Sequence, residues 1–176
     1  SGTVSSRAVL VSSLSGAENV PNVARVTTVS FPDRHFIAGG CQEFGGGGDF
    51  DPMLVRFSTQ EDFTKFKPTA TNTAGDQRLE IGTKIVGMVS SREETIISTD
   101  EAIYGMTFVG PPFTFSFRLL ATNAGASGLN SLINIDGDVY WMGKRNFFRY
   151  DGVVKELPCP VKHYVFNRMQ DKYIDK

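Results

Sequence analysis

Short apolar runs separated by polar turns recur along the whole of this chain. From Met53 to Phe57 the side chains alternate, so that Leu54 and Arg56 share one face of an expected strand while Met53, Val55 and Phe57 share the other. Further short runs are interpreted as strands at 25–30, 34–38, 81–89, 94–98, 102–109, 129–135, 138–142 and 146–150. The pattern predicts an all-β protein of short antiparallel strands.

One passage occurs twice. Ala70-Thr71-Asn72 is followed by Ala74-Gly75, and 51 residues later Ala121-Thr122-Asn123 is followed by Ala124-Gly125. Three apolar runs follow each copy. Several short strands at a fixed period of about 45–50 residues are typical of a β-propeller blade. Asn72 with Gly75, and Asn123 with Gly125, are predicted to form the same turn in adjacent units through side-chain-to-backbone hydrogen bonds.

The period divides the chain into predicted parts. Val55, Ile103 and Phe147 align, being 48 and 44 residues apart. The expected parts are an extended N-terminal arm at 1–24, propeller-like blades at about 25–69, 70–120 and 121–162, and a short C-terminal helix or segment at 163–176. A closed propeller needs at least about four blades, so other segments complete the ring or the blades form an open stack. The absence of an initiating methionine favours a partial chain.

Glycine and proline mark the expected turns. Asp136-Gly137 and Asp151-Gly152 each lie between apolar runs, which is a strong hairpin signal. Gly110-Pro111-Pro112 cannot continue a strand ladder because two prolines remove two donors, and it is predicted to redirect the chain between blades. Gly45, Gly46, Gly47 and Gly48 predict a flexible loop that contacts a partner.

Charge and cysteine content exclude several classes of function. The chain has 18 basic and 19 acidic residues, which argues against sequence-independent binding of nucleic acid through a basic face. Two cysteines do not make a disulfide framework, and they favour folding in a reducing compartment. No secretory signal and no apolar run of membrane-spanning length is present in the sequence.

A zinc site is the first chemical candidate. His35, Cys41, Cys159 and His163 form two pairs of soft ligands that could meet around one ion. Their spacing is not a standard one, so buried thiols and ordinary histidines are the preferred interpretation. No metal and no cofactor is assigned.

The carboxylates and aromatics give the remaining candidates. The pairs Glu93-Glu94 and Asp100-Glu101 are expected at solvated turns, whereas a glycosidase holds two carboxylates facing across a cleft. Trp141, Phe147 and Tyr150 are predicted to form core between blades, with a sugar-stacking face that includes Phe148 as the alternative.

A phosphate loop at Gly143-Lys144 is rejected because Arg145 stands where a magnesium-binding Ser or Thr is needed. No catalytic residue is assigned, and the chain is predicted not to be an enzyme.

An ordered series of motifs runs from about residue 33 to 166. It consists of 51–58 (DPMLVRFS) with Glu61, 70–76 (ATNTAGD), 110–115 (GPPFTF), 141–143 (WMG), 150–152 (YDG), 157–159 (LPC) and 164–166 (YVF). In this order the motifs resemble the tail-hub or nozzle proteins of short-tailed bacteriophages, also described as packaged-DNA stabilisation proteins.

The resemblance implies a β-propeller-containing structural subunit of the virion, assembled in the host cytoplasm. Such subunits form a six-fold homo-oligomeric ring below the portal and adaptor, contact other tail proteins, and help to retain and release the packaged DNA. The DNA is expected to pass without sequence-specific binding. The family contributes no catalytic residues, and its members are several times longer than this chain. The alternative is a glycan- or receptor-binding propeller module, which an exposed patch of Trp141 and Tyr150 would favour.

Overall fold

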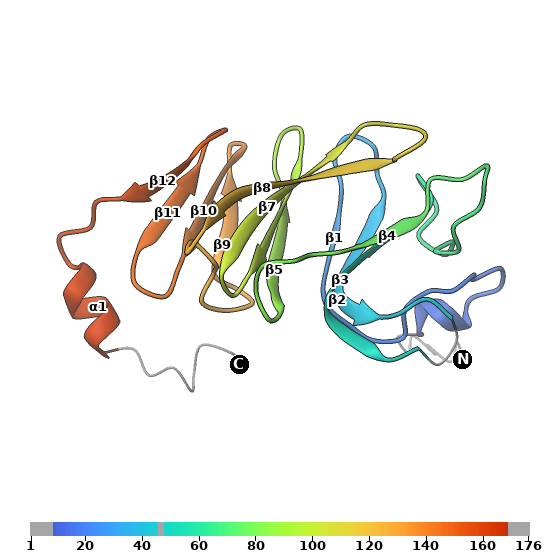
Figure 1. Ribbon diagram of the computed structural model, residues 1–176, viewed down its shortest axis with the longest axis horizontal. Helices are drawn as coiled ribbons and strands as arrows, with labels where there is room; N and C mark the ends of the chain where they lie inside the picture. Colours follow the sequence, from blue (N-terminus) through green and yellow to red (C-terminus); the bar gives the residue numbers. More distant parts are fainter. Residues whose placement is uncertain (1–8, 46–47, 169–176) are drawn as a thin grey trace, which may run out of the picture.

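The computed structural model describes residues 9–45 and 48–168. Twelve strands form three four-stranded antiparallel sheets in which each strand pairs with the next (Figure 1). The first sheet contains β1 (Ala24–Val29), β2 (Phe36–Gln42), β3 (Phe50–Phe57) and β4 (Gly75–Arg78). The second contains β5 (Ile85–Ser90), β6 (Thr95–Thr99), β7 (Ala102–Phe108) and β8 (Phe115–Thr122). The third contains β9 (Leu132–Ile135), β10 (Asp138–Met142), β11 (Phe147–Tyr150) and β12 (Val154–Leu157).

The prediction of an all-β protein is confirmed. No sheet closes on itself within residues 9–45 and 48–168, so a propeller stays a prediction. The helical segments of this part of the chain are the 3-10 turn η1 (Val11–Ser13) and α1 (Lys162–Arg168). Neither of them is long and apolar enough to cross a membrane. The helix expected at 163–176 corresponds to α1 as far as Arg168, and the rest of that range lies outside the described residues.

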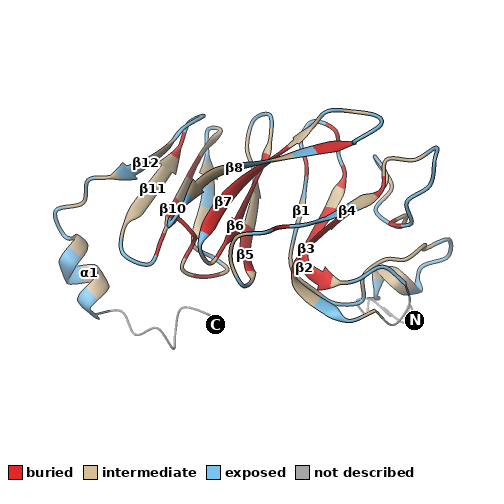
Figure 2. Cartoon of the chain, viewed as in Figure 1, coloured by how far each residue is buried: buried red, intermediate tan, exposed pale blue. Residues whose placement is uncertain are grey.

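The three sheets stack face to face in a row along the long axis of the molecule (Figure 1). Strand β5 is central to the row, because it contacts β1, β2 and β3 on one side and β9 on the other. The first strands of consecutive sheets are therefore neighbours. Figure 2 shows buried residues concentrated in the strands, with exposed residues at the turns and in α1.

Two apolar cores hold the row together. Between the first and second sheets, Ile37, Met53 and Val55 pack against Ile85 and other side chains of the second sheet. Between the second and third sheets, the core is made of Val86, Ile96, Ile103, Ala124, Ala126, Val139, Trp141 and Tyr150. Because alternate residues of a strand point to opposite faces, the second sheet contributes to both cores.

A third, smaller core covers the far face of the first sheet. Ala38, Cys41, Leu54 and Phe66 form it, with Val20 packed against them. The guanidinium of Arg56, only 2% exposed, donates to the carbonyl oxygens of Asn19 (2.6 Å) and Gln42 (3.1 Å). The segment expected as an N-terminal arm thus lies against the first sheet around Asn19, while its residues 1–8 lie outside the described part.

The strand positions correct two details of the predicted organisation. Strand β4 pairs with β3, so the expected division between 69 and 70 falls inside the first sheet. Gly110-Pro111-Pro112 lies in the hairpin between β7 and β8, within one sheet, and does not redirect the chain between sheets. The two prolines need no partner there, since they stand in the loop beyond the last ladder pair, Phe108 with Phe115.

The two copies of the repeated passage occupy different places. The first copy leads into β4, the outer strand of the first sheet, and ends at its first residue, Gly75. The second copy begins in the last two residues of β8, the outer strand of the second sheet, and continues beyond it to Gly125. The asparagines also differ. Asn72 accepts a hydrogen bond from the Thr69 backbone (2.9 Å) and donates to the carbonyl of Lys67 (2.8 Å), while Asn123 takes a left-handed conformation with φ 56°. The expectation of one shared turn is wrong, but Val55, Ile103 and Phe147 do all lie in the third strand of their sheets.

Candidate functional site

Three turns meet at one end of the second and third sheets and line a cavity of about 350 Å³ that opens to solvent. In consecutive antiparallel sheets that pack face to face, the turns after the second strand of each sheet lie at the same end. One wall comes from the turn between β6 and β7, another from the segment after β8, and a third from the turn between β10 and β11. The lining residues are Asp100, Glu101, Asn123, Gly125, Lys144, Arg145, Asn146 and Phe148.

Backbone contacts form one side of this cavity. The carbonyl of Glu101 accepts hydrogen bonds from the amides of Ala124 (3.1 Å) and Gly125 (3.2 Å). A Cβ on Gly125 would lie 2.4 Å from the carbonyl carbon of Asp100, so only glycine permits this approach. Asn123, whose backbone is left-handed, and Gly125 both line the cavity.

Two stacked aromatic side chains support the opposite wall. Trp141 is 3% exposed, and its Nε1 donates to the carbonyl of Ala124 (2.7 Å). Its ring stacks on Phe148, with centroids 5.5 Å apart and an interplanar angle of 18°. Phe148 is half-buried and lines the cavity. Trp141 is therefore core that fixes a cavity-lining ring, and it belongs to no exposed patch.

The acidic side of the cavity contains one fixed and one exposed carboxylate. Asp100 accepts hydrogen bonds from the amide of Thr83 (2.7 Å), the hydroxyl of Thr83 (2.7 Å) and the amide of Lys84 (3.4 Å). Burial raises the pKa of Asp100, but these hydrogen bonds outweigh it, and the net effect is a lowered pKa. Glu101 is exposed. Asp100 thus stays ionised at neutral pH and keeps its position.

The basic side of the cavity comes from the turn between β10 and β11. Lys144 and Arg145 are exposed, and neither forms an ion pair with another residue of the described ranges. The ammonium of Lys162 donates to Oδ1 of Asn146 (2.7 Å), which orients that amide and leaves its Nδ2 as a donor. Cations and carboxylates therefore face the same space without neutralising each other.

Tyr150 belongs to the same core but not to the cavity lining. Its hydroxyl donates to Oε1 of Glu94, and Nη2 of Arg118 donates to the hydroxyl (3.3 Å). Burial, followed by the hydrogen bond and charge of Glu94, raises the pKa of Tyr150 to about 12. Tyr150 is 3% exposed, so with Trp141 also buried, the exposed aromatic patch expected for a receptor-binding module is not formed by these two residues.

Phe147 lies elsewhere. Its ring contacts Phe166 of α1, with centroids 5.3 Å apart, on the face of the third sheet that points away from the second. The expectation of core between sheets is wrong for this residue. Its neighbour Phe148 takes that place, because adjacent strand residues point to opposite faces.

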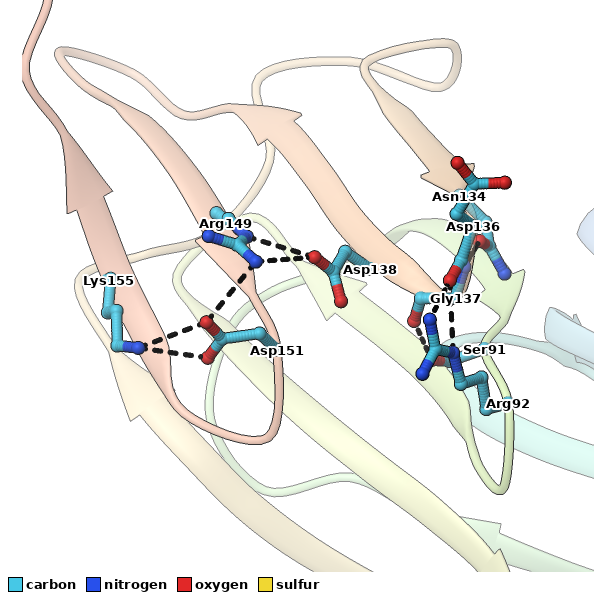
Figure 3. Close-up of polar contacts among 9 residues, drawn as sticks. All are labelled: Ser91, Arg92, Asn134, Asp136, Gly137, Asp138, Arg149, Asp151 and Lys155. Atoms are coloured by element: carbon cyan, nitrogen blue, oxygen red, sulfur yellow. Dashed lines mark hydrogen bonds and ion pairs between the residues drawn. The ribbon is translucent and has the colours of Figure 1, made fainter.

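The predicted hairpin turns hold the other end of the third sheet (Figure 3). Asp136 and Gly137 both have positive φ, 53° and 94°, as a two-residue turn requires. Their carbonyls accept hydrogen bonds from Arg92 (3.0 Å from its Nε) and from the hydroxyl of Ser91 (2.6 Å), both in the turn between β5 and β6. This end of the sheet pair is closed by polar contacts, in contrast to the end with the cavity.

The second such turn, Asp151-Gly152, joins β11 to β12 (Figure 3). Asp151 pairs with Lys155 (3.0 Å) and with Arg149 (3.5 Å), and Arg149 also donates to Asp138 (2.6 Å). Gly152 has φ 103°, a conformation that favours glycine. The contacts run across the outward face of the third sheet.

The residues of the candidate zinc site do not form one site. His35 and Cys41 lie in the first sheet region, whereas Cys159 and His163 follow β12. His35 is fully buried, and its ring nitrogens bond to Asp33 (2.8 Å) and Thr73 (2.9 Å). Burial raises the pKa of the Cys41 thiol to about 12. In the described part of the chain, no group of three His, Cys, Asp or Glu residues is placed to hold a metal.

The glycine-rich loop lies between β2 and β3, and Gly46 and Gly47 are outside the described residues. Gly45 has φ 104°, and the amide of Gly48 donates to its carbonyl (2.9 Å). The prediction of a partner contact at this loop stays a prediction.

Sequence reasoning singled out Asn123 and Gly125 as turn residues, and Asp100 and Glu101 as solvated acids. It did not bring them together with Lys144, Arg145 and Asn146. These residues come together only because strands far apart in the sequence pack against each other, and no local sequence pattern predicts such packing.

No protein-family model matches this chain, and no curated protein is similar to it. The arrangement itself can bind a small polar molecule, since it offers donors, acceptors and one aromatic wall.

Proposed function

We propose that this chain is a structural component of a bacteriophage tail hub or nozzle, and that its three sheets are consecutive blades of a β-propeller. The ordered motifs between about residues 33 and 166 supply the family. The architecture supports the blades, since each sheet is a four-stranded antiparallel meander and the next sheet packs on its face. In a propeller the first strands of successive blades surround the axis. The contacts of β5 with β1 and β9 correspond to that arrangement.

The observation that carries the proposal is the outward face of the third sheet. Ile133 is 56% exposed and Ile135 is 51% exposed, although both are strand residues of β9. Tyr140 and Phe147 lie on the same face, as the register of the sheet shows, and α1 contacts this face at Phe147 through Phe166. Each of the other two junctions in the row buries such a face under the neighbouring sheet. A row of blades that continues into further segments or subunits would cover this one.

The charge of the chain agrees with a role beside DNA. Formal net charge is −1, with acidic and basic residues nearly equal in number. A channel without a basic lining would let DNA slide, because phosphates are retained by Lys and Arg contacts. Under this proposal the subunit forms a six-fold ring between the portal and adaptor and the other tail proteins, and it has no catalytic role.

Single-particle imaging of the assembled protein tests the proposal, with the intact subunit mass measured alongside. We expect a six-fold ring around an axial channel, in which sheets of this chain are consecutive blades. A compact monomer near 19.3 kDa, with no ring at any concentration, would contradict it. Clusters of Lys or Arg along the channel wall would contradict the argument about DNA while leaving the ring intact.

A further inference from the structure

We propose that the cavity between the second and third sheets binds a single sugar unit that carries a carboxylate group. The inference concerns binding, which the structural role proposed above does not require. It depends on the residues that face the cavity, on the volume they enclose and on the way their neighbours hold them.

The volume suits a small ligand. At about 350 Å³ the cavity lies at the lower end of the usual range for small-molecule pockets, roughly 300–1,000 Å³. Three turns from different parts of the chain wall it, and two of them are fixed by the backbone hydrogen bonds of Glu101 to Ala124 and Gly125. The space is thus preformed and accommodates one substituted ring.

The polar groups suit hydroxyls. A sugar hydroxyl donates one hydrogen bond and accepts others, so it needs acceptors and donors side by side. Glu101 supplies an acceptor, Nδ2 of Asn146 supplies a donor, and Asn123 supplies both. Asp100 adds a fixed negative charge behind them, since its oxygens are already occupied by Thr83 and Lys84.

The aromatic wall suits the apolar face of a ring. Phe148 lines the cavity and is held from behind by Trp141, which in turn is anchored to the carbonyl of Ala124. A ring placed against Phe148 buries its C–H groups without displacing the tryptophan. Stacking on a rigid aromatic side chain contributes affinity at little entropic cost.

The charges favour a ligand with one negative charge over a multiply charged anion or a cation. Lys144 and Arg145 have no ion-pair partner in the described ranges and can pair with a carboxylate. A phosphate or another multiply charged anion would be repelled by Asp100 and Glu101 on the facing wall. A cation would be repelled by the basic turn. A carboxylate carries a single charge, so Asp100 and Glu101 repel it less than they repel a phosphate, and it can pair with Lys144 and Arg145 while the sugar hydroxyls face the acidic side.

Titration of the isotopically labelled chain with D-glucuronate, followed by NMR, tests the proposal. We expect shifts at the side-chain amides of Asn123 and Asn146 and at the ring of Phe148. D-Glucose carries a hydroxymethyl group where glucuronate has its carboxylate, and it should bind about tenfold more weakly, the loss expected for one charge-assisted hydrogen bond. Acetate should bind more weakly than either.

Two variants separate the contributions. Lys144→Ala combined with Arg145→Ala should remove the preference for glucuronate over glucose, while Asn123→Gly, which keeps the left-handed turn, should weaken both sugars alike. The control Lys67→Ala removes an exposed charge in the first sheet region and should change neither affinity. The proposal is overturned if neither sugar binds, if the shifts map elsewhere, if acetate binds as well as glucuronate, or if the double variant keeps the preference.

Discussion

The two ends of the row of sheets differ in how far their outer faces are covered. The far face of the first sheet is covered by residues around Asn19 and by Phe66, which is fully buried. The outward face of the third sheet leaves Ile133 and Ile135 more than half exposed. The meander topology therefore does not determine by itself whether the outer face of a sheet is covered by other segments. The difference is made by a buried cation and by loop segments outside the strands.

At the covered end, hydrogen bonds attach the covering segment to the first-sheet region beside an apolar core. Amide hydrogen bonds join Glu18 to Thr64 and to Phe66, both at 2.8 Å. Arg56 donates to backbone carbonyls, and its guanidinium lies 5.5 Å from the ring centroid of Phe44 and 5.7 Å from that of Phe66. Because carbonyls satisfy the charge, the covering segment can pack over it without leaving a buried cation unpaired.

The largest expected effect comes from removing the cover. Phe66→Ala should lower the free energy of unfolding by about 3–5 kcal/mol, the usual cost of truncating a buried phenylalanine. Urea denaturation measures it. Phe63→Ala in the same loop is the control, since Phe63 is 51% exposed and should change stability by less than about 1 kcal/mol. Equal losses in the two variants would mean that the cover is not packed as described.

The buried cation should have the next largest effect. Arg56→Met keeps much of the volume but leaves the carbonyls of Asn19 and Gln42 without their donor, which should cost about 3 kcal/mol. Arg34→Met is the matched control, because Arg34 pairs with Glu61 at the surface and should contribute no more than about 0.5 kcal/mol. If urea denaturation gave Arg56→Met the same free energy of unfolding as the unmodified chain, the arginine would not hold the covering segment.

A smaller, pH-dependent effect should come from a buried histidine of the first-sheet region, His35. Burial lowers the pKa of His35, and its hydrogen bond and charge interaction with Asp33 only partly oppose this. The unfolded chain then binds a proton at a higher pH than the folded chain. Stability is therefore complete above about pH 6.5 and is lost below it, by up to about 1.4 kcal/mol per pH unit.

Urea midpoints at pH 7.5 and pH 5.5 measure this dependence. His35→Gln should flatten it, whereas His163→Gln should leave it unchanged because His163 is exposed. A slope that persists in the His35 variant would assign the pH dependence to other groups.

The smallest effect is expected at the uncovered end. Ile133→Thr with Ile135→Thr keeps two β-branched residues in β9 and should change the free energy of unfolding by no more than about 0.5 kcal/mol. Sedimentation velocity should show less self-association, because an apolar face is removed. A decrease of several kcal/mol in the free energy of unfolding would mean that these side chains are already buried. The two ends of the row would then not differ in how far they are covered.

Much of the fold could be predicted from hydrophobic periodicity, and the omissions have a common cause. The inner strands were predicted because they alternate or are fully apolar, as in β6, where every residue is buried. The outer strands β4 and β12 were missed because their sequences, GDQR and VKEL, carry no clear apolar pattern and contain no buried residue. Strand β8 was missed because Gly110-Pro111-Pro112 is predicted to redirect the chain between blades, whereas it lies in the hairpin that leads into β8.

The repeated passage was the least reliable signal for the organisation of the chain. Gly75 and Gly125 are both required by close approaches, but to different partners. A Cβ on Gly75 would lie 2.7 Å from the ring of Phe57, whereas one on Gly125 would meet the backbone of Asp100. Both positions require a residue without a Cβ, so the same residue type occurs at positions that are not equivalent in the fold. The cavity escaped prediction for a related reason, since its walls are far apart in sequence and only sheet packing joins them.

The third sheet occupies one short stretch of chain, from Leu132 to Leu157. It touches the second sheet and its turns through one core and a set of hydrogen bonds, among them those of Arg92, Ser91, Tyr150 and Trp141. A unit of this kind, with local strand pairing and a single junction, opens and recloses cooperatively at a lower free energy than the whole molecule. Amide protons of β10 and β11 should therefore exchange together, and earlier than those of β6. We therefore expect the sheets to unfold in order, with the third sheet opening first.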